Sequence, residues 1–156
     1  MAEDHRTRHE SPRERRKSCQ SCAKGTASSH QGFPGFVDTY EQEVGEWTVS
    51  MESNFVDMDQ APFFKGAPND QCQANHMGYV LKGRFGVRRG GGVEEIFEAG
   101  DAFVIEPGHT PIVFAGSEYV AFTPTDEAKA QNAVIMKFGK EQGIDLPGQP
   151  ATSDSD

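Results

Sequence analysis

The chain has 156 residues, enough for one domain of ordinary size, and its net charge at pH 7 is −9. This acidity argues against a folded surface that binds nucleic acid, and no stretch approaches the roughly 18 apolar residues of a membrane-spanning helix. The cysteine count of three is odd, and the charged beginning lacks the apolar segment of a secretory signal. The sequence therefore predicts a cytoplasmic protein with reduced thiols and no membrane association.

Both ends of the sequence are too polar to fold. In residues 1–32 the only large apolar side chain is Met1, and residues 148–156 are equally poor in them. Such segments cannot bury enough apolar surface to offset the entropy of ordering the backbone. We expect a disordered basic head at 1–32, a folded domain at 33–147 and a disordered acidic tail at 148–156. The basic head leaves open a scaffold that recruits an acidic partner.

Two cysteines in the head, Cys19 and Cys22, have the spacing of half a zinc site. No matching second pair follows, so the alternative to a metal or redox role is two exposed thiols.

The middle of the chain has the pattern of many short strands. Trp47, Val49 and Met51 alternate with polar residues, which predicts a half-buried strand. A loop with an aromatic anchor is expected at residues 61–68. Further β-rich segments, separated by glycine turns, occupy residues 77–87 (interrupted at Gly83), 93–97, 102–105, 112–114 and 119–122. Short strands at intervals of roughly 8–12 residues indicate a sandwich or a barrel.

One amphipathic helix is expected after Pro124. Thr125 is the predicted N-cap, and the acidic residues 126–127 suit the first turn. Ala130, Val134 and Phe138 recur at four-residue spacing, so this helix should cover the sandwich or barrel.

Cys72 and His76 are metal-ligand residue types at an ambiguous spacing. On a straight strand, residues four apart lie about 13 Å from each other, too far to share one ion. A helix is unlikely between Pro68 and Gly78, so we expect the chain to bend at residues 74–75. A second imidazole, His109, follows another short strand segment in Pro-Gly-His.

Residues 69–122 resemble the cupin family of small β-barrels. Typical cupins carry H-x-H-x3-E-x6-G and then G-x5-P-x-G-x2-H. Counting back from Gly83 places His76, Cys72 and Asp70 on the three ligand positions of the first motif. In the second motif Gly100 and Gly108 match, Glu106 and Pro111 stand at the usual Pro and His, and His109 lies two residues early, about 6–7 Å along a strand. The match is closer to a subgroup of small bacterial cupins with Cys-x3-His-x-Gly-Tyr-Val-Leu-x-Gly and Pro-Gly-His.

This resemblance implies an all-β fold: a cupin-like double-stranded β-helix, or jelly-roll, barrel with one C-terminal α-helix and disordered termini. It also implies a metal site formed by Cys72, His76 and His109. That ligand set suits Zn²⁺ first and Fe²⁺ second, with copper as a further rival. Three ligands leave a coordination position open, whereas a fourth from Asp70 would make the site structural. The alternative is a buried Cys72 and a hydrogen-bonded His76 with no metal.

The expected function is a metal-binding protein that takes a small-molecule ligand into its barrel. One alternative is a metal-dependent oxygenase, isomerase or hydrolase; the other is a structural barrel without metal that carries an interaction tail. The acid–base candidates near the metal are Asp70, Tyr79 and Glu106, and no obvious acid–base pair is present. Binding is therefore favoured over catalysis. Cupins often pair through their outer strands, so the resemblance also implies a possible homodimer.

Overall fold

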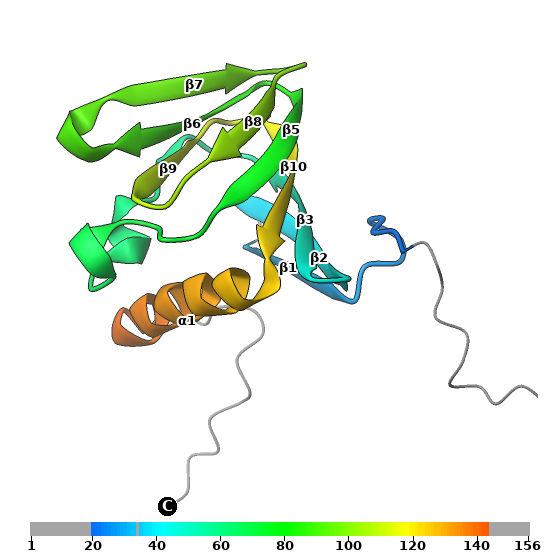
Figure 1. Cartoon of the computed structure of the whole chain (residues 1–156), viewed down its shortest axis with the longest axis horizontal. Coiled ribbons are helices and arrows are strands. Elements are labelled where there is room, and N and C mark those ends of the chain that lie inside the picture. The colour runs from blue at the N-terminus through cyan, green and yellow to red at the C-terminus, as the bar shows by residue number, and fades with distance from the viewer. Residues whose placement is uncertain (1–19, 34, 144–156) are drawn as a thin grey trace, which may run out of the picture.

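The computed structural model describes residues 20–33 and 35–143. Within these residues the chain forms ten strands, one α-helix and three short 3-10 turns (Figure 1). The elements are β1 (Ser29–Phe33), β2 (Val37–Val44), β3 (Trp47–Asn54), β4 (Met58–Asp59), η1 (Ala61–Phe64), η2 (Pro68–Asp70), β5 (His76–Lys82), β6 (Arg84–Arg89), η3 (Gly90–Gly92), β7 (Glu94–Glu98), β8 (Ala102–Ile105), β9 (His109–Val113), β10 (Glu118–Pro124) and α1 (Thr125–Glu141).

The strands form two antiparallel sheets that alternate along the chain. The larger sheet has the order β1-β2-β3-β10-β5-β8, and the smaller one has the order β4-β9-β6-β7. The eight strands from β3 to β10 thus exchange between two layers in the order of a jelly roll. This confirms the predicted all-β fold with a C-terminal helix, although neither sheet closes on itself.

The N-terminal part of the larger sheet was not predicted. All but the last residue of strand β1 lie in the range 1–32 that was expected to be disordered, and the strand pairs along its whole length with β2. Edge strands of this kind are held by backbone hydrogen bonds, so a composition without large apolar side chains does not reveal them. The remaining head, residues 1–19, and the predicted tail at 148–156 lie outside the described residues.

The core lies between the two sheets. Strand β5 shows the expected alternation: Val80 is fully buried, whereas Met77, Tyr79 and Leu81 face outward. The buried cluster is aromatic at its centre, where the ring of Phe85 lies 5.4 Å from that of Phe103 and 4.5 Å from that of Tyr119. Tyr79 therefore does not belong to this aromatic cluster.

Helix α1 lies across one end of the two layers, below β10 in Figure 1. Its side chains contact the loop between β4 and β5: the Phe138 ring lies 5.3 Å from that of Phe63, and Val134 and Ile135 pack against Phe64. None of the described helices is both long and apolar enough to cross a membrane.

The predicted N-cap of α1 is wrong by one residue. Pro124 occupies the cap position and Thr125 is already helical. No side-chain cap is needed, because the Thr125 N–H donates to the Glu46 carbonyl in the turn between β2 and β3 at 3.0 Å. The Thr125 hydroxyl instead accepts a hydrogen bond from that of Thr48 at 3.2 Å.

Candidate metal centre

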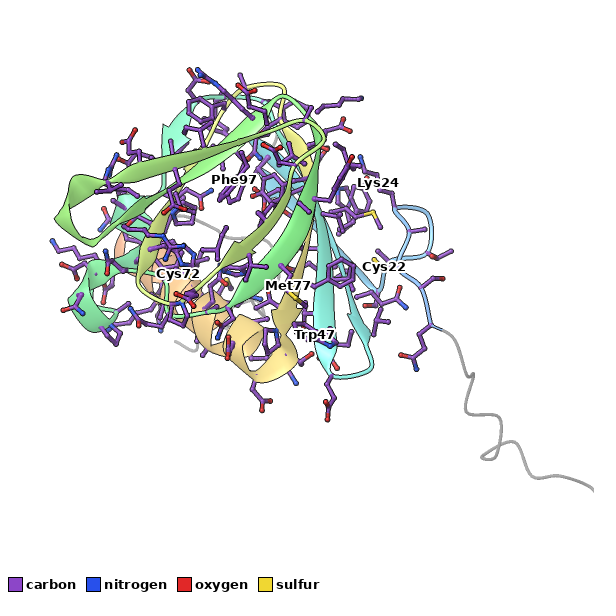
Figure 2. The ribbon with its side chains drawn as sticks, turned by 45° about the horizontal axis from the view of Figure 1, so that its top comes forward. Cys22, Lys24, Trp47, Cys72, Met77 and Phe97 are labelled. Atoms are coloured by element: carbon purple, nitrogen blue, oxygen red, sulfur yellow. The ribbon has the colours of Figure 1, made fainter. Side chains whose placement is uncertain are left out.

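Three of the predicted ligand residues converge in the folded chain. Cys72, His76 and His109 each offer one donor atom, and these atoms all lie within 4.8 Å of one another. Cys72 and His109 are almost completely buried, and His76 is largely so. Figure 2 shows Cys72 close to α1, on a different side of the molecule from Cys22.

The backbone holds Cys72 directly opposite His109. The Cys72 N–H donates to the His109 carbonyl at 2.7 Å, and the Gly108 N–H donates to the Cys72 carbonyl at 2.8 Å. This isolated bridge brings the entrance of β5 beside the start of β9. It explains how His109 reaches the cluster although it stands two residues before the position that the motif would give it.

The predicted bend between Cys72 and His76 is confirmed. The Cys72 sulfur lies 3.6 Å from His76 Nε2, against about 13 Å for a straight strand. The bend is fastened to α1 at Asn75, whose backbone N–H donates to Glu127 Oε2 at 2.6 Å and whose amide donates to both carboxylate oxygens. Ala74 is buried against Phe64 beneath it.

Hydrogen bonds orient both imidazoles toward the cluster. His109 Nδ1 lies 2.8 Å from the Glu106 carbonyl, which can only accept, so Nδ1 carries the proton and Nε2 keeps its lone pair. His76 Nδ1 lies 2.7 Å from the Thr123 hydroxyl, and its Nε2 faces the Cys72 sulfur. Partners on the far nitrogen are what orient histidine ligands at metal sites.

Burial keeps the cluster uncharged when no ion is bound. It raises the pKa of the Cys72 thiol to about 11, with the nearby Glu127 carboxylate adding to the effect. It lowers the pKa of His76 to about 4, helped by His109, and also lowers the pKa of His109. At neutral pH the site therefore presents one thiol and two neutral imidazoles, so that only the thiol must lose a proton to bind a metal.

The donor set fits a tetrahedral ion. Zn–S and Zn–N bonds of about 2.3 and 2.0–2.1 Å at a tetrahedral angle place the two donor atoms roughly 3.6 Å apart. This matches the separation of the Cys72 sulfur and His76 Nε2. One thiolate and two imidazoles are also the ligand chemistry of zinc and of first-row metals with similar preferences.

The other predicted candidates lie elsewhere. Asp70 is exposed, and its carboxylate accepts a hydrogen bond from the Gly66 N–H at 2.8 Å instead of joining the cluster. The side chain of Glu106 is exposed, and it is the backbone carbonyl that serves the site. Tyr79 faces outward, Cys22 lies apart from the cluster, and Cys19 falls outside the described residues.

The cluster borders a large interior cavity. A space of about 670 Å³ lies between the two sheets and α1, and His76, Thr123 and Pro111 are among its lining residues. Its size is that of typical small-molecule sites. His76 therefore connects the three donor atoms with a space that a ligand can occupy.

Several residues that contact the cluster or line the cavity were not predicted from the sequence. Thr123 and Glu127 orient the ligand residues from β10 and α1, and Glu52 and Tyr119 form a polar pair in the cavity. The alternation along β10 predicts that Thr123 and Tyr119 share a face. Their partners come from strands and loops whose pairing cannot be seen in the sequence.

No known family model matches the chain, and no curated protein matches it either. Solved structures are similar at low identity. An RmlC-like cupin from Shewanella frigidimarina NCIMB 400 is 17% identical with a TM-score of 0.46, covering 68% of this chain and 92% of that one. Fe(II) HppE is 10% identical with a TM-score of 0.48, covering 68% and 60%.

The EutQ protein of Clostridium difficile is 14% identical with a TM-score of 0.43, covering 56% of this chain and 61% of that one. The chain thus spans about three fifths of that protein's length. At these values the similarities assign neither a family nor an activity to the chain.

Proposed function

We propose that this protein is a metal-binding jelly-roll protein of cupin type that takes a small-molecule ligand into its interior. Cys72, His76 and His109 are the proposed metal ligands, with Zn²⁺ as the first choice and Fe²⁺ as the second. The observation that supports this most directly is the convergence of these three donor atoms within 4.8 Å, beside a cavity of about 670 Å³.

The chain's own groups prepare this site for an ion. The Glu106 carbonyl and the Thr123 hydroxyl fix the two imidazoles with Nε2 toward the cluster, while the buried Cys72 contributes the one negative charge. A bound ion would supply a Lewis acid with an open position. Because His76 lines the cavity, a ligand there could reach that position.

A metal-dependent enzyme is the second candidate. The open position favours it, since a catalytic metal needs room for water or substrate. Yet Glu127, the carboxylate that acts on the pKa of both Cys72 and His76, is occupied by three hydrogen bonds from Asn75. General acid–base catalysis needs a group free to exchange a proton with the substrate, so binding remains the better supported function.

Elemental analysis of the purified full chain tests the metal site. We expect stoichiometric zinc or iron in the parent protein. Cys72→Ala and His109→Ala each remove a ligand, so each should weaken metal affinity by at least the roughly 10- to 100-fold that losing a ligand's hydrogen-bond partner costs. An EPR or visible signature that responds to oxygen would identify iron and favour the enzyme.

The matched control is Cys22→Ala, which removes a free cysteine on another side of the molecule. It should keep full metal occupancy. Because Cys72 also packs with Phe64 in the core, its replacement could unfold the protein. Circular dichroism therefore checks that each variant is folded. If the folded Cys72→Ala and His109→Ala proteins bind as much metal as the parent, the proposed site is refuted. If the parent is metal-free and takes up neither Zn²⁺ nor Fe²⁺, metal binding is refuted and the hypothesis of a structural barrel without metal remains.

We further propose a homodimer in the cytoplasm. The outer face of the larger sheet exposes a set of apolar side chains that no described helix covers: Trp47, Met77, Tyr79, Leu81, Val104 and Phe122. Contiguous apolar surface of this kind marks interaction sites. A reducing compartment would keep the Cys72 thiol available for a metal.

A further inference from the structure

The interior cavity has a second polar end, away from the Cys–His cluster. Glu52 on β3 and Tyr119 on β10 face each other across the strand pair, and the Tyr119 hydroxyl donates to Glu52 Oε1 at 2.5 Å. Thr123 and Tyr119 are four residues apart on β10, which is about 13 Å along a strand. The pair therefore lies at the opposite end of the cavity from His76, which is held by Thr123.

A second carboxyl group, that of Glu41, accompanies the pair. Thr39 on β2 is the register partner of Glu52, so Glu41 is its diagonal neighbour on the same face, about 7–8 Å away. Both carboxyl groups line the cavity. Burial raises the pKa of each, and for Glu52 the nearby Glu41 adds to this while hydrogen bonds from Tyr119 and Asn54 oppose it.

Among residues 20–33 and 35–143, no positive side chain forms an ion pair with these carboxyl groups. None of the described residues that line the cavity is Lys or Arg. Glu52 receives hydrogen bonds from Tyr119 and Asn54, which are uncharged, and burial is the only influence on the Glu41 carboxyl group among the described residues. Glu52 and Glu41 are both partly buried, and both line the cavity. Burying carboxylates without a partner is unfavourable, so a ligand that supplied the positive charge would be stabilised there.

We propose that the Glu41–Glu52 end of the cavity binds the positive group of a small organic cation, most simply a protonated amine on an apolar chain. The middle of the cavity suits the apolar part, since Met58, Phe85, Val113 and Ala121 line it. This inference rests on the proposed binding of a small molecule in the barrel, and it names the chemical class of that molecule.

Calorimetric titration of the full chain at neutral pH with hexylammonium, 1-hexanol and hexanoate tests the proposal. These probes share their apolar chain and differ in charge. We expect hexylammonium to bind at least about tenfold more tightly than hexanol, because only it can pair with the carboxyl groups, and hexanoate to bind most weakly. Equal affinity for hexylammonium and hexanol would overturn the proposal.

Glu52→Gln removes the charge and keeps the shape and an acceptor for the Tyr119 hydroxyl. It should weaken hexylammonium binding by about tenfold or more and leave hexanol unchanged. The matched control is Glu118→Gln, which removes the same charge from a residue paired with Lys82 outside the cavity; it should change affinity by less than about twofold. If both variants lost the same affinity for hexylammonium, the effect would be one of net charge alone, and the proposed cation site would be refuted.

Elemental analysis of the same samples separates this proposal from the metal site. Glu52→Gln should retain the metal content of the parent, since the two ends of the cavity lie about 13 Å apart. If the metal is bound but hexylammonium is not preferred, the ligand class is wrong and the metal site stands. If hexylammonium is bound without any metal, the metal site is wrong and the cation site stands.

Discussion

Cys72 contributes both to the core and to the proposed metal site. Its side chain packs with Phe64 and Ala74, and burial raises its pKa to about 11. These two properties alone would be enough for a cysteine with a purely structural role. The sulfur, however, lies 3.6 Å from Nε2 of His76, and the oriented imidazole of His109 is close by. This arrangement distinguishes a ligand set from a cysteine that only fills space.

The state of these groups predicts that metal binding releases about one proton per chain near pH 7.5. The thiol is protonated below its pKa of about 11, whereas both imidazoles have lowered pKa values and are already neutral. Metal affinity should therefore rise about tenfold per pH unit from pH 6.5 to 9. Calorimetry of zinc binding in buffers of different ionisation enthalpy measures the proton count.

Cys72→Ser provides the control for this count. It keeps the size of the side chain, but its hydroxyl does not ionise in this pH range, so the pH slope should disappear together with most of the affinity. A second proton released near pH 7.5 could come from water on the open position, which ionises near pH 7 on zinc. Release of two or more protons at pH 5.5 would mean that an imidazole is charged before binding, which contradicts the lowered pKa values of His76 and His109.

Of the four ligand candidates that the sequence predicted, three lie together in the structure. Their residue types and the impossible reach of a straight strand led to Cys72, His76 and a bend between them. Asp70 was included because the motif places it two residues before Cys72. The position of a residue in a motif, however, does not determine where its side chain points. In the structure Asp70 has a φ of +54° and bonds to Gly66, so its carboxylate serves the loop.

Strand β5 is the element that connects the site to the core. It begins at His76 and lies between β10 and β8, so both neighbouring strands must approach it closely. Gly78 permits this approach: a Cβ at this position would meet the Val120 carbonyl oxygen and the Phe103 ring. The glycine is thus required by packing rather than by a turn.

Gly78→Ala should reduce the free energy of unfolding by about 1–3 kcal/mol, because the Phe103 ring and strand β10 must shift to make room. Chemical denaturation measures this directly. The matched control is Gly90→Ala, since a Cβ at Gly90 meets nothing within 4 Å and its φ is not in the left-handed region.

The control should be neutral or more stable by up to about 1 kcal/mol, through the smaller entropy of its unfolded chain. If Gly78→Ala were as stable as Gly90→Ala, the close packing of β5 against β10 and β8 would be contradicted.

Strand β2 shows why some elements were not predicted. Its sequence, VDTYEQEV, has no clean apolar alternation, because its inward side chains Thr39 and Glu41 line the cavity and are not packed in the core. Hydrophobic period reveals a strand only where one face is packed with apolar side chains. Strands β5, β8 and β10 meet that condition, and the sequence located them well.

At the scale of the whole molecule, the outer face of the larger sheet exposes apolar side chains that no described helix covers. Val104 is 68% exposed and Leu81 52% exposed, on neighbouring strands. Copies with a net charge of −9 repel each other, so an uncharged face is where two of them can approach at the least electrostatic cost. A second copy is the occupant that this argument favours.

Sedimentation at high micromolar concentration should show a dimer that Leu81→Glu and Val104→Glu each convert toward monomer, because a charge would be buried in the interface. The matched control is Val93→Glu, an equally exposed residue just before β7 in the other sheet, which should leave the dimer intact. A monomeric parent would refute the dimer, and dissociation by Val93→Glu would place the interface elsewhere.

The sequence by itself determined the class of fold, the positions of the central strands and the helix, and the residue types of the proposed metal site, since these follow from local hydrophobic period, turn residues and ligand chemistry. The tertiary structure alone decided which candidates meet. The Cys72–His109 bridge, the hydrogen bond between His76 and Thr123 and the pairing of Glu52 with Tyr119 join segments 37 to 67 residues apart. Contacts over such separations depend on strand register and layer order, which no local pattern contains.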